Sequence, residues 1–323
     1  MSMRINLRSS LAVAVIWALC GLSAVMAADW PSGPVHLIVP FPPGGSNDVI
    51  ARRLAEQLTK SLGQSVIVEN KAGGAGTIGS QAVASAAPDG KTFLFISNSI
   101  ATSAAVQQTP YNAVTAFTAI TPVAQAPFVI ITRTGFPART VPELVEIAKR
   151  NPGSLNYGSA GLGDTTQMTT ELFGDIVGVR MTGVNYKGIS PAQLDLVAGR
   201  LDLMITTMAS IRGTAADQLP KLAFTSAKRD PDYPDVPTVL EQGIDYVVDV
   251  WWGVFAPAGL APAIRDRMNR EIAAIVATPD FAQFLKNFGA SPVSSSPAEF
   301  QAVLASDVER WKHIAQRAGI HMQ

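Results

Sequence analysis

The sequence predicts an α/β fold of two lobes with a ligand cleft between them, and three observations favour it. Short apolar runs alternate with stretches of helical periodicity along most of the 323 residues, a pattern typical of a mainly parallel sheet covered by helices. Two similar units, at residues 38–48 and 155–165, each join a strand to a helix through a loop of small residues. Once an N-terminal segment is set aside, about 295 residues remain, which is enough for two lobes of ordinary size.

The expected elements follow one another along the whole chain. Runs rich in apolar and β-branched residues predict strands at 35–39, 65–69, 92–96, 128–132, 155–157, 184–186, 201–206, 221–225 and 247–255. Helical spacing predicts helices at 46–62, 78–87, 141–149, 164–177, from 190 onward, and at 262–277, 279–287 and 297–318. The last three are expected to pack back on the first lobe. The chain would then cross between the lobes near residues 128 and 250, which assigns 29–128 and 250–323 to the first lobe and 129–249 to the second.

Local signals mark several helix ends. Ser46 is a candidate N-cap, and Gly63 follows the last periodic residue of the same helix. Asp164 with Gln167 resembles a capping box, and so does the stretch from Ser190 to Gln193, which has proline at its first helical position. Pro142 occupies the first turn of another predicted helix.

Residues 1–28 have the composition of a secretory signal peptide. Two arginines precede an apolar run, and small residues allow cleavage after Ala27 or Ala28. A membrane anchor is the alternative, but the run is shorter than the roughly 20 residues that a spanning helix needs. Cys20 could mark a lipoprotein, although the residues before it are a poor context for lipid attachment. The signal peptide predicts export to the periplasm.

Charge and cysteine usage narrow the partners of the mature chain. The whole chain has 25 basic and 25 acidic side chains. The signal removes two arginines and no acid, which leaves 23 against 25 and argues against a nucleic-acid partner. Cys20 is the single cysteine, so the mature chain is expected to lack disulfides and cysteine metal sites.

The two small-residue loops suggest an anion site. Gly44 and Gly45 lie in the first loop, and Gly161 and Gly163 lie in the second. A loop of this kind presents unpaired backbone N–H groups and the positive end of a helix dipole, so it can hold an anion without lysine or arginine. The glycines could instead serve only tight turns. Two such loops, one in each lobe, favour a shared ligand cleft.

Catalytic and cofactor motifs are weak in comparison. The three histidines, at positions 36, 313 and 321, are too dispersed for a catalytic triad near either loop, and no cluster has the spacing of a metal site. Residues 74–79 match the dinucleotide pattern Gly-x-Gly-x-x-Gly, but they follow the second strand of the unit rather than the first. A loop that needs glycine dihedrals and close helix contact is the preferred interpretation. We expect no enzyme activity, cofactor or metal.

Eight short sequence blocks occur along the mature chain: 40–48 (PFPPGGSND), 68–74 (VENKAGG), 87–90 (APDG), 157–161 (YGSAG), 186–188 (YKG), 225–229 (TSAKR), 234–238 (PDVPT) and 255–259 (FAPAG). Together they resemble one known family, the Bug-type extracytoplasmic solute receptors of tripartite tricarboxylate transporters. They extend over almost the whole mature chain in the family order. The resemblance implies a type II-like periplasmic-binding-protein fold that closes on a small carboxylate and delivers it to a membrane permease.

The resemblance also implies roles for individual residues. Ser46 and Asn47 would hold the carboxylate from the first lobe, with Phe41 covering it and Ser97 or Asn98 lining the wall. Contacts from the second lobe, partly through waters, would come from Ser159, Ala160, Gly161 and Thr165. The complete candidate set is Phe41, Gly44, Gly45, Ser46, Asn47, Ser97, Asn98, Ser159, Ala160, Gly161, Gly163, Thr165, Tyr186 and Thr206.

Two positions depart from the common family pattern. Gln167 stands where many members have histidine, and Thr206 stands where many have an aspartate that can meet a ligand ammonium. The change at Thr206 argues against an amino-acid ligand, although Asp164 could substitute. We therefore expect a monomeric receptor for a mono- or dicarboxylate. The alternatives are an exported sensor that passes its ligand signal to a partner, or an exported α/β enzyme.

Overall fold

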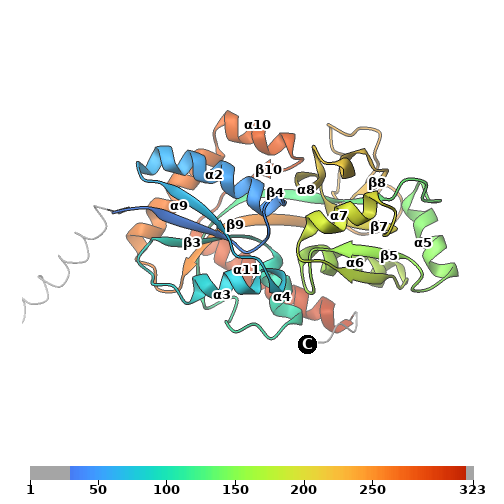
Figure 1. Ribbon diagram of the computed structural model, residues 1–323, viewed down its shortest axis with the longest axis horizontal. Helices are drawn as coiled ribbons and strands as arrows, with labels where there is room; N and C mark the ends of the chain where they lie inside the picture. The colour runs from blue at the N-terminus through green and yellow to red at the C-terminus, as the bar shows by residue number, and fades with distance from the viewer. Residues whose placement is uncertain (1–29, 318–323) are drawn as a thin grey trace, which may run out of the picture.

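Two groups of strands lie side by side along the long axis of the molecule and form the two lobes (Figure 1). The computed structural model describes residues 30–317. The first lobe contains β1 (Val35–Val39), β2 (Val66–Asn70), β3 (Thr92–Ser97), β10 (Ser291–Pro292), β9 (Asp249–Pro257) and the first part of β4 (Phe117–Thr132). The second lobe contains the end of β4 with β5 (Asn156–Ser159), β6 (Thr182–Asn185), β7 (Leu203–Thr207) and β8 (Lys221–Phe224). The predicted signal peptide and its cleavage site lie outside the described residues.

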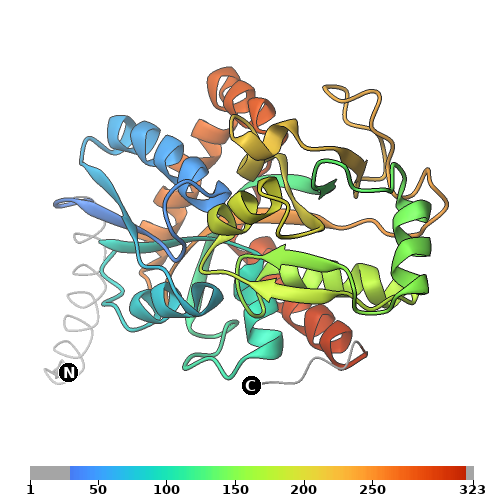
Figure 2. The same ribbon diagram turned by 45° about the vertical axis from the view of Figure 1, so that its right-hand side comes forward.

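Helices cover both faces of each lobe (Figures 1 and 2). On the first lobe, one face carries α2 (Ser46–Leu62), α9 (Pro262–Val276) and α10 (Pro279–Asn287), and the other carries α3 (Thr77–Ala84), α4 (Ser99–Val106) and α11 (Pro297–Arg317). The second lobe has α5 (Val141–Arg150), α6 (Thr165–Val177), α7 (Ile189–Val197), α8 (Met208–Ile211) and the short 3-10 turn η2 (Ala215–Gln218). The C-terminal helices thus contact α2, α4 and β4 of the first lobe.

The sheet is mixed, which corrects the expectation of a mainly parallel one. Its strand order is β2-β1-β3-β9-β4-β7-β5-β6. β1 pairs in parallel with β2 and β3, and β5 pairs in parallel with β6 and β7. The central strands β4 and β9 are antiparallel to each other and to the neighbours they join. The reason is topological, because β4 carries the chain out of the first lobe and β9 brings it back.

β4 is much longer than the predicted strand at 128–132. It has 16 residues and pairs with β9 at one end and with β7 and β8 at the other. Its register shifts next to Pro122, since proline cannot donate to a ladder and tends to occur at irregularities. This irregular first part is what concealed the strand from pattern analysis.

The glycines of residues 73–79 serve backbone geometry. Gly73, Gly74 and Gly76 have positive φ around the 3-10 turn η1 (Gly74–Gly76). Gly79 packs so tightly that an added Cβ would lie 2.7 Å from both the Lys71 carbonyl oxygen and the Pro40 Cβ. Positive φ angles and close backbone contact are the two reasons for which a loop requires glycine.

Two predicted helix N-caps are wrong. Gly45, rather than Ser46, is the N-cap of α2, and Ser46 is the first helical residue. α7 begins at Ile189 without a side-chain cap, so no capping box forms at Ser190. There, the Gln193 side chain donates instead to the Ser210 carbonyl at 2.9 Å.

The predicted capping box at the start of α6 forms only in part. Asp164 is the N-cap, but its carboxylate accepts from Thr166 N–H, and Gln167 accepts from Gly163 N–H at 2.6 Å rather than from the cap residue. The predicted glycine end of α2 at Gly63 is confirmed, with φ of 67°.

Candidate functional site

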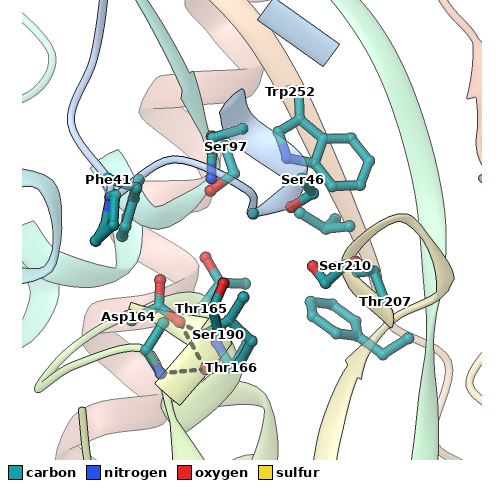
Figure 3. A pocket seen from close by; sticks show the side chains of 17 residues that line it. Phe41, Ser46, Ser97, Asp164, Thr165, Thr166, Ser190, Thr207, Ser210 and Trp252 are labelled. Atoms are coloured by element: carbon teal, nitrogen blue, oxygen red, sulfur yellow. Dashed lines mark hydrogen bonds between the residues drawn. The ribbon is translucent and has the colours of Figure 1, made fainter. Parts of the chain in front are cut away.

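A cavity of about 530 Å³, its mouth included, lies between the two lobes. Figure 3 shows Ser46, Ser97 and Trp252 on one side of it and Asp164, Thr165 and Ser190 on the other. The full lining consists of Phe41, Pro42, Gly45, Ser46, Asn47, Ser97, Phe128, Ala160, Asp164, Thr165, Thr166, Ile189, Ser190, Thr207, Ser210, Val250 and Trp252.

The first-lobe end of the cavity is the open N-terminus of α2. The N-cap Gly45 has no side chain to satisfy the first turn, so the N–H groups of Ser46 and Asn47 have no helical partner. They lie where the helix dipole favours negative charge. These amides and the Ser46 hydroxyl form an anion-binding end.

Asp48 supports this loop from behind. Its carboxylate accepts from Gly44 N–H at 3.0 Å, from Arg52 Nε at 3.0 Å and from Asn70 Nδ2 at 2.9 Å. Burial alone would raise the pKa of Asp48, but the hydrogen bonds from Arg52, Asn70 and Gly44 outweigh it and lower the pKa. The ionised form of Asp48, which the lowered pKa favours, supports the loop and pairs with Arg52.

The second-lobe end is different, because α6 is already capped by the protein itself. Asp164 Oδ1 accepts from Thr166 N–H at 2.8 Å and from Thr166 Oγ1 at 2.6 Å. The Gly163 N–H donates to Gln167, and the Ala160 N–H donates to Thr166 Oγ1 at 3.0 Å. The two loops are thus similar in sequence and unlike in chemistry, since only the first leaves its helix N-terminus open to an outside anion.

The cavity walls combine hydroxyls with apolar surface. Hydroxyl groups come from Ser46, Ser97, Thr165, Thr166, Ser190, Thr207 and Ser210. Phe41, Phe128 and Trp252 supply aromatic surface. Among the lining residues there is no lysine, arginine or histidine, and Asp164 is the one ionisable side chain. Two buried lining atoms, Asn47 Oδ1 and Trp252 Nε1, have no hydrogen-bond partner in the protein, so they are available to a bound molecule.

Seven of the fourteen predicted residues line the cavity: Phe41, Gly45, Ser46, Asn47, Ser97, Ala160 and Thr165. Gly161 and Tyr186 instead line a second hollow, to which both lobes contribute and where Phe41 and Ala160 also lie. Gly44, Asn98, Ser159, Gly163 and Thr206 line neither. The structure therefore gathers about half of the expected site in one place.

The residues outside the cavity have other partners. Ser159 is fully buried and its hydroxyl donates to Asn185 Oδ1 at 2.6 Å. The Tyr186 hydroxyl donates to Asp195 at 2.6 Å, and burial together with this bond raises the pKa of Tyr186 to about 12. Gly163 presses against Val106 of the first lobe.

Trp252 lines the cavity although it was not among the predicted site residues. Its neighbour Trp251 packs elsewhere, since its indole donates to Asp307 at 2.7 Å and its ring meets Phe300 edge-on. Side chains alternate along a strand, so the next residue of β9 faces the cavity. The same alternation brings Thr207, rather than Thr206, to the lining.

The lobes touch across the cleft. Thr165 Oγ1 donates to Asn98 Oδ1 at 3.1 Å, and the Gln107 side-chain amide donates to the Leu162 carbonyl. Ser103 Oγ lies 3.4 Å from the Gly163 carbonyl oxygen. All three contacts join α4 of the first lobe to residues 162–165 of the second. The described conformation is therefore a closed one.

Residues 30–317 contain no group of three or more His, Cys, Asp or Glu side chains that could hold a metal ion. The two histidines in the range lie away from the cavity, with His36 paired to Glu69 and His313 exposed on the surface of α11. No helix in the range has both the length and the apolar character of a membrane span.

Comparison with known proteins shows the family. The profile of the tripartite tricarboxylate transporter family receptor matches residues 50–320. The chain belongs to this family. Its sequence is 33% identical to the protein BugT of Bordetella pertussis over 325 residues, covering 98% of this chain and 100% of that one. The Bug-type resemblance found in the sequence blocks is confirmed.

Solved structures of related proteins have the same fold. The structure of R. palustris Rpa4515 with adipate superposes with a TM-score of 0.87 at 35% identity, covering 91% of this chain and all of that one. The periplasmic binding protein BugD gives a TM-score of 0.85 at 33% identity, again with 91% and 100% coverage. This receptor therefore has the two-lobed periplasmic-binding-protein fold, and it is a solute-binding protein of the family.

Proposed function

We propose that the mature chain is exported to the periplasm, captures a small organic carboxylate between its lobes and delivers it to the membrane permease of a tripartite transporter. The observation that carries the proposal is the uncapped N-terminus of α2, which opens into the cavity between the lobes. The amides of Ser46 and Asn47 can hold a carboxylate there. The adipate bound to the similar Rpa4515 protein supports the same ligand class.

Closure of the lobes is the proposed mode of capture. The first lobe consists of residues 29–128 and 250–323, and the second of residues 129–249. The chain crosses between them near Phe128 and near Trp251, and these two crossovers act as the hinge. Each lobe supplies part of the lining, so a bound ligand favours the closed state over the open one. The indole of Trp252 lies in the lining and reports ligand entry by its fluorescence.

The screening experiment is a thermal-shift assay of the mature protein over mono- and dicarboxylates. A ligand that binds only the native state raises its stability by RT ln(1 + [L]/Kd). Hits are then incubated with stoichiometric protein, and the ligand is examined by mass spectrometry. We expect stabilisation by at least one carboxylate, recovered unchanged. Stabilisation by none of them, or conversion at an enzyme-like rate, would overturn the proposal.

A further inference from the structure

Asp164 is the one ionisable side chain in the cavity lining, and it is an acid in a site proposed to bind an acid. It is 4% exposed, and among residues 30–317 it forms no ion pair with a basic side chain. Burial raises its pKa despite the hydrogen bonds from Thr166 and Thr165. A buried carboxylate without a cation is costly, and the capping of α6 by Asp164 offsets part of this cost.

The two oxygens of Asp164 have different surroundings. Both hydrogen bonds from Thr166 end on Oδ1. Figure 3 shows the other oxygen directed away from Thr166, into the space between Phe41 and the second lobe. The two bonds from Thr166 therefore occupy Oδ1, and neither of them reaches the oxygen that faces the cavity.

The two ends of the cavity consequently have opposite preferences. At α2, free amides and the dipole attract a carboxylate. At Asp164 in its ionised form, a second ionised carboxylate would meet a like charge in a buried place, and the lining has no lysine, arginine or histidine to compensate it. A hydroxyl or an ammonium would instead donate a hydrogen bond to the free oxygen, and bonds to charged groups are among the stronger ones.

We infer, on the basis of the proposed function, that Asp164 accepts a hydrogen bond from a donor group on the ligand and rejects a second ionised carboxylate at its end of the cavity. The ligand is then a monocarboxylate that carries a hydroxyl or an amino group. The apolar side chains of Phe128, Ile189 and Val250 in the lining contact its carbon chain. Asp164 is the residue that sets this specificity.

The test is calorimetry with matched ligands of four, five and six carbons. Each chain length is offered as the plain monocarboxylate, the dicarboxylate, and monocarboxylates with a hydroxyl or an amino group at the second or the terminal carbon. The wild-type protein should bind its best hydroxy or amino ligand at least about tenfold more tightly than the dicarboxylate of equal length. The hydroxy and amino arms then distinguish the two donors.

The variant Asp164→Asn keeps the N-cap and removes the charge, because asparagine caps helices about as well as aspartate. In this variant the tenfold preference should fall to about threefold or less. Asp164→Ser, another capping residue, should do the same, so a folding defect in one variant does not decide the matter. Glu146→Gln removes an exposed carboxylate of the same lobe and should leave the preference unchanged.

Two outcomes would overturn the inference while the proposed function stands. One is a wild-type protein that binds the dicarboxylate as tightly as any donor-bearing ligand. The other is a preference that survives in both Asp164 variants. If no carboxylate binds to the wild-type protein or to any variant, the proposed function itself fails.

Discussion

Thr165 donates a hydrogen bond to Asn98 at 3.1 Å and so joins the first turn of α6 to the N-cap of α4. Both side chains are buried, with exposed fractions of 3% and 0%. Thr165 belongs to the second lobe, and Asn98 belongs to the first lobe. The pair can therefore form only when the cleft is closed, and it lies next to the cavity that the ligand would occupy.

Weakening closure away from the cavity should lower affinity without changing selectivity. Gln107 joins the Leu162 carbonyl across the cleft but does not line the cavity. Gln107→Leu removes about 0.5–1.5 kcal/mol of net hydrogen bonding, so we expect roughly a threefold to tenfold weaker carboxylate affinity by calorimetry. Gln108→Leu, at the exposed neighbouring position, is the matched control. Equal effects of the two changes would contradict this role for Gln107.

Filling the α2 end should abolish binding. Ser46 lines the cavity at the open helix N-terminus, and Ser46→Phe would place a ring where the carboxylate is expected. Affinity should fall by about 100-fold or more, because the bulky ring excludes the ligand and covers the amides. Ser61→Phe, on the exposed side of the same helix, should bind as the wild type does. A Ser46→Phe protein that is folded and binds normally would place the ligand elsewhere.

Affinity should depend only weakly on salt. The cavity lining offers amides and hydroxyls but no basic side chain, and buried dipoles are screened much less than exposed ion pairs. Between 20 and 500 mM sodium chloride we expect the Kd to change by less than about threefold. A loss of tenfold or more would indicate a cationic site, or chloride competing for the α2 end.

The unliganded Asp164→Asn protein should gain stability relative to the wild type as the pH rises. Burial raises the folded-state pKa of Asp164 above the ordinary 3.8. The folded wild type therefore binds its proton more tightly than the unfolded chain does. This proton binding contributes stability to the folded wild type. The contribution is fully present below pH 3.8 and is lost as the pH rises through the folded-state pKa of Asp164.

Urea unfolding of both proteins at pH 4 and pH 7 measures this effect. The free energy of unfolding of the Asp164→Asn variant minus that of the wild type should be larger at pH 7 than at pH 4. A difference that is independent of pH, or one that shrinks toward pH 7, would show that burial does not disfavour the ionised form of Asp164.

Much of the architecture follows from local patterns in the sequence. The strand at Val35–Val39, the glycine end of α2 at Gly63 and the N-cap at Asp164 are observed as predicted. Each rests on residues close together in the chain, where apolar periodicity or capping chemistry acts directly. The family blocks then linked these elements to a known two-lobed fold.

The errors arose where long-range packing decides the outcome. Thr206 and Thr207 are adjacent, and which of them faces the cavity depends on how β7 sits against β4. A shift of one residue exchanges the two faces of a strand. In the same way, no local signal separates Trp252 in the cavity from Trp251 in the hinge packing. The unequal ends of the cavity also required the structure, because only the structure shows that α2 has no side-chain cap and that Asp164, the predicted cap of α6, also lines the cavity.

A crystal structure of the receptor with the best carboxylate of the screen tests the central claim most directly. The account predicts a ligand enclosed between the lobes, with carboxylate oxygens about 3 Å from the Ser46 or Asn47 N–H groups or linked to them by one water. A carboxylate seated against Asp164, or a ligand bound outside the cleft, would contradict it.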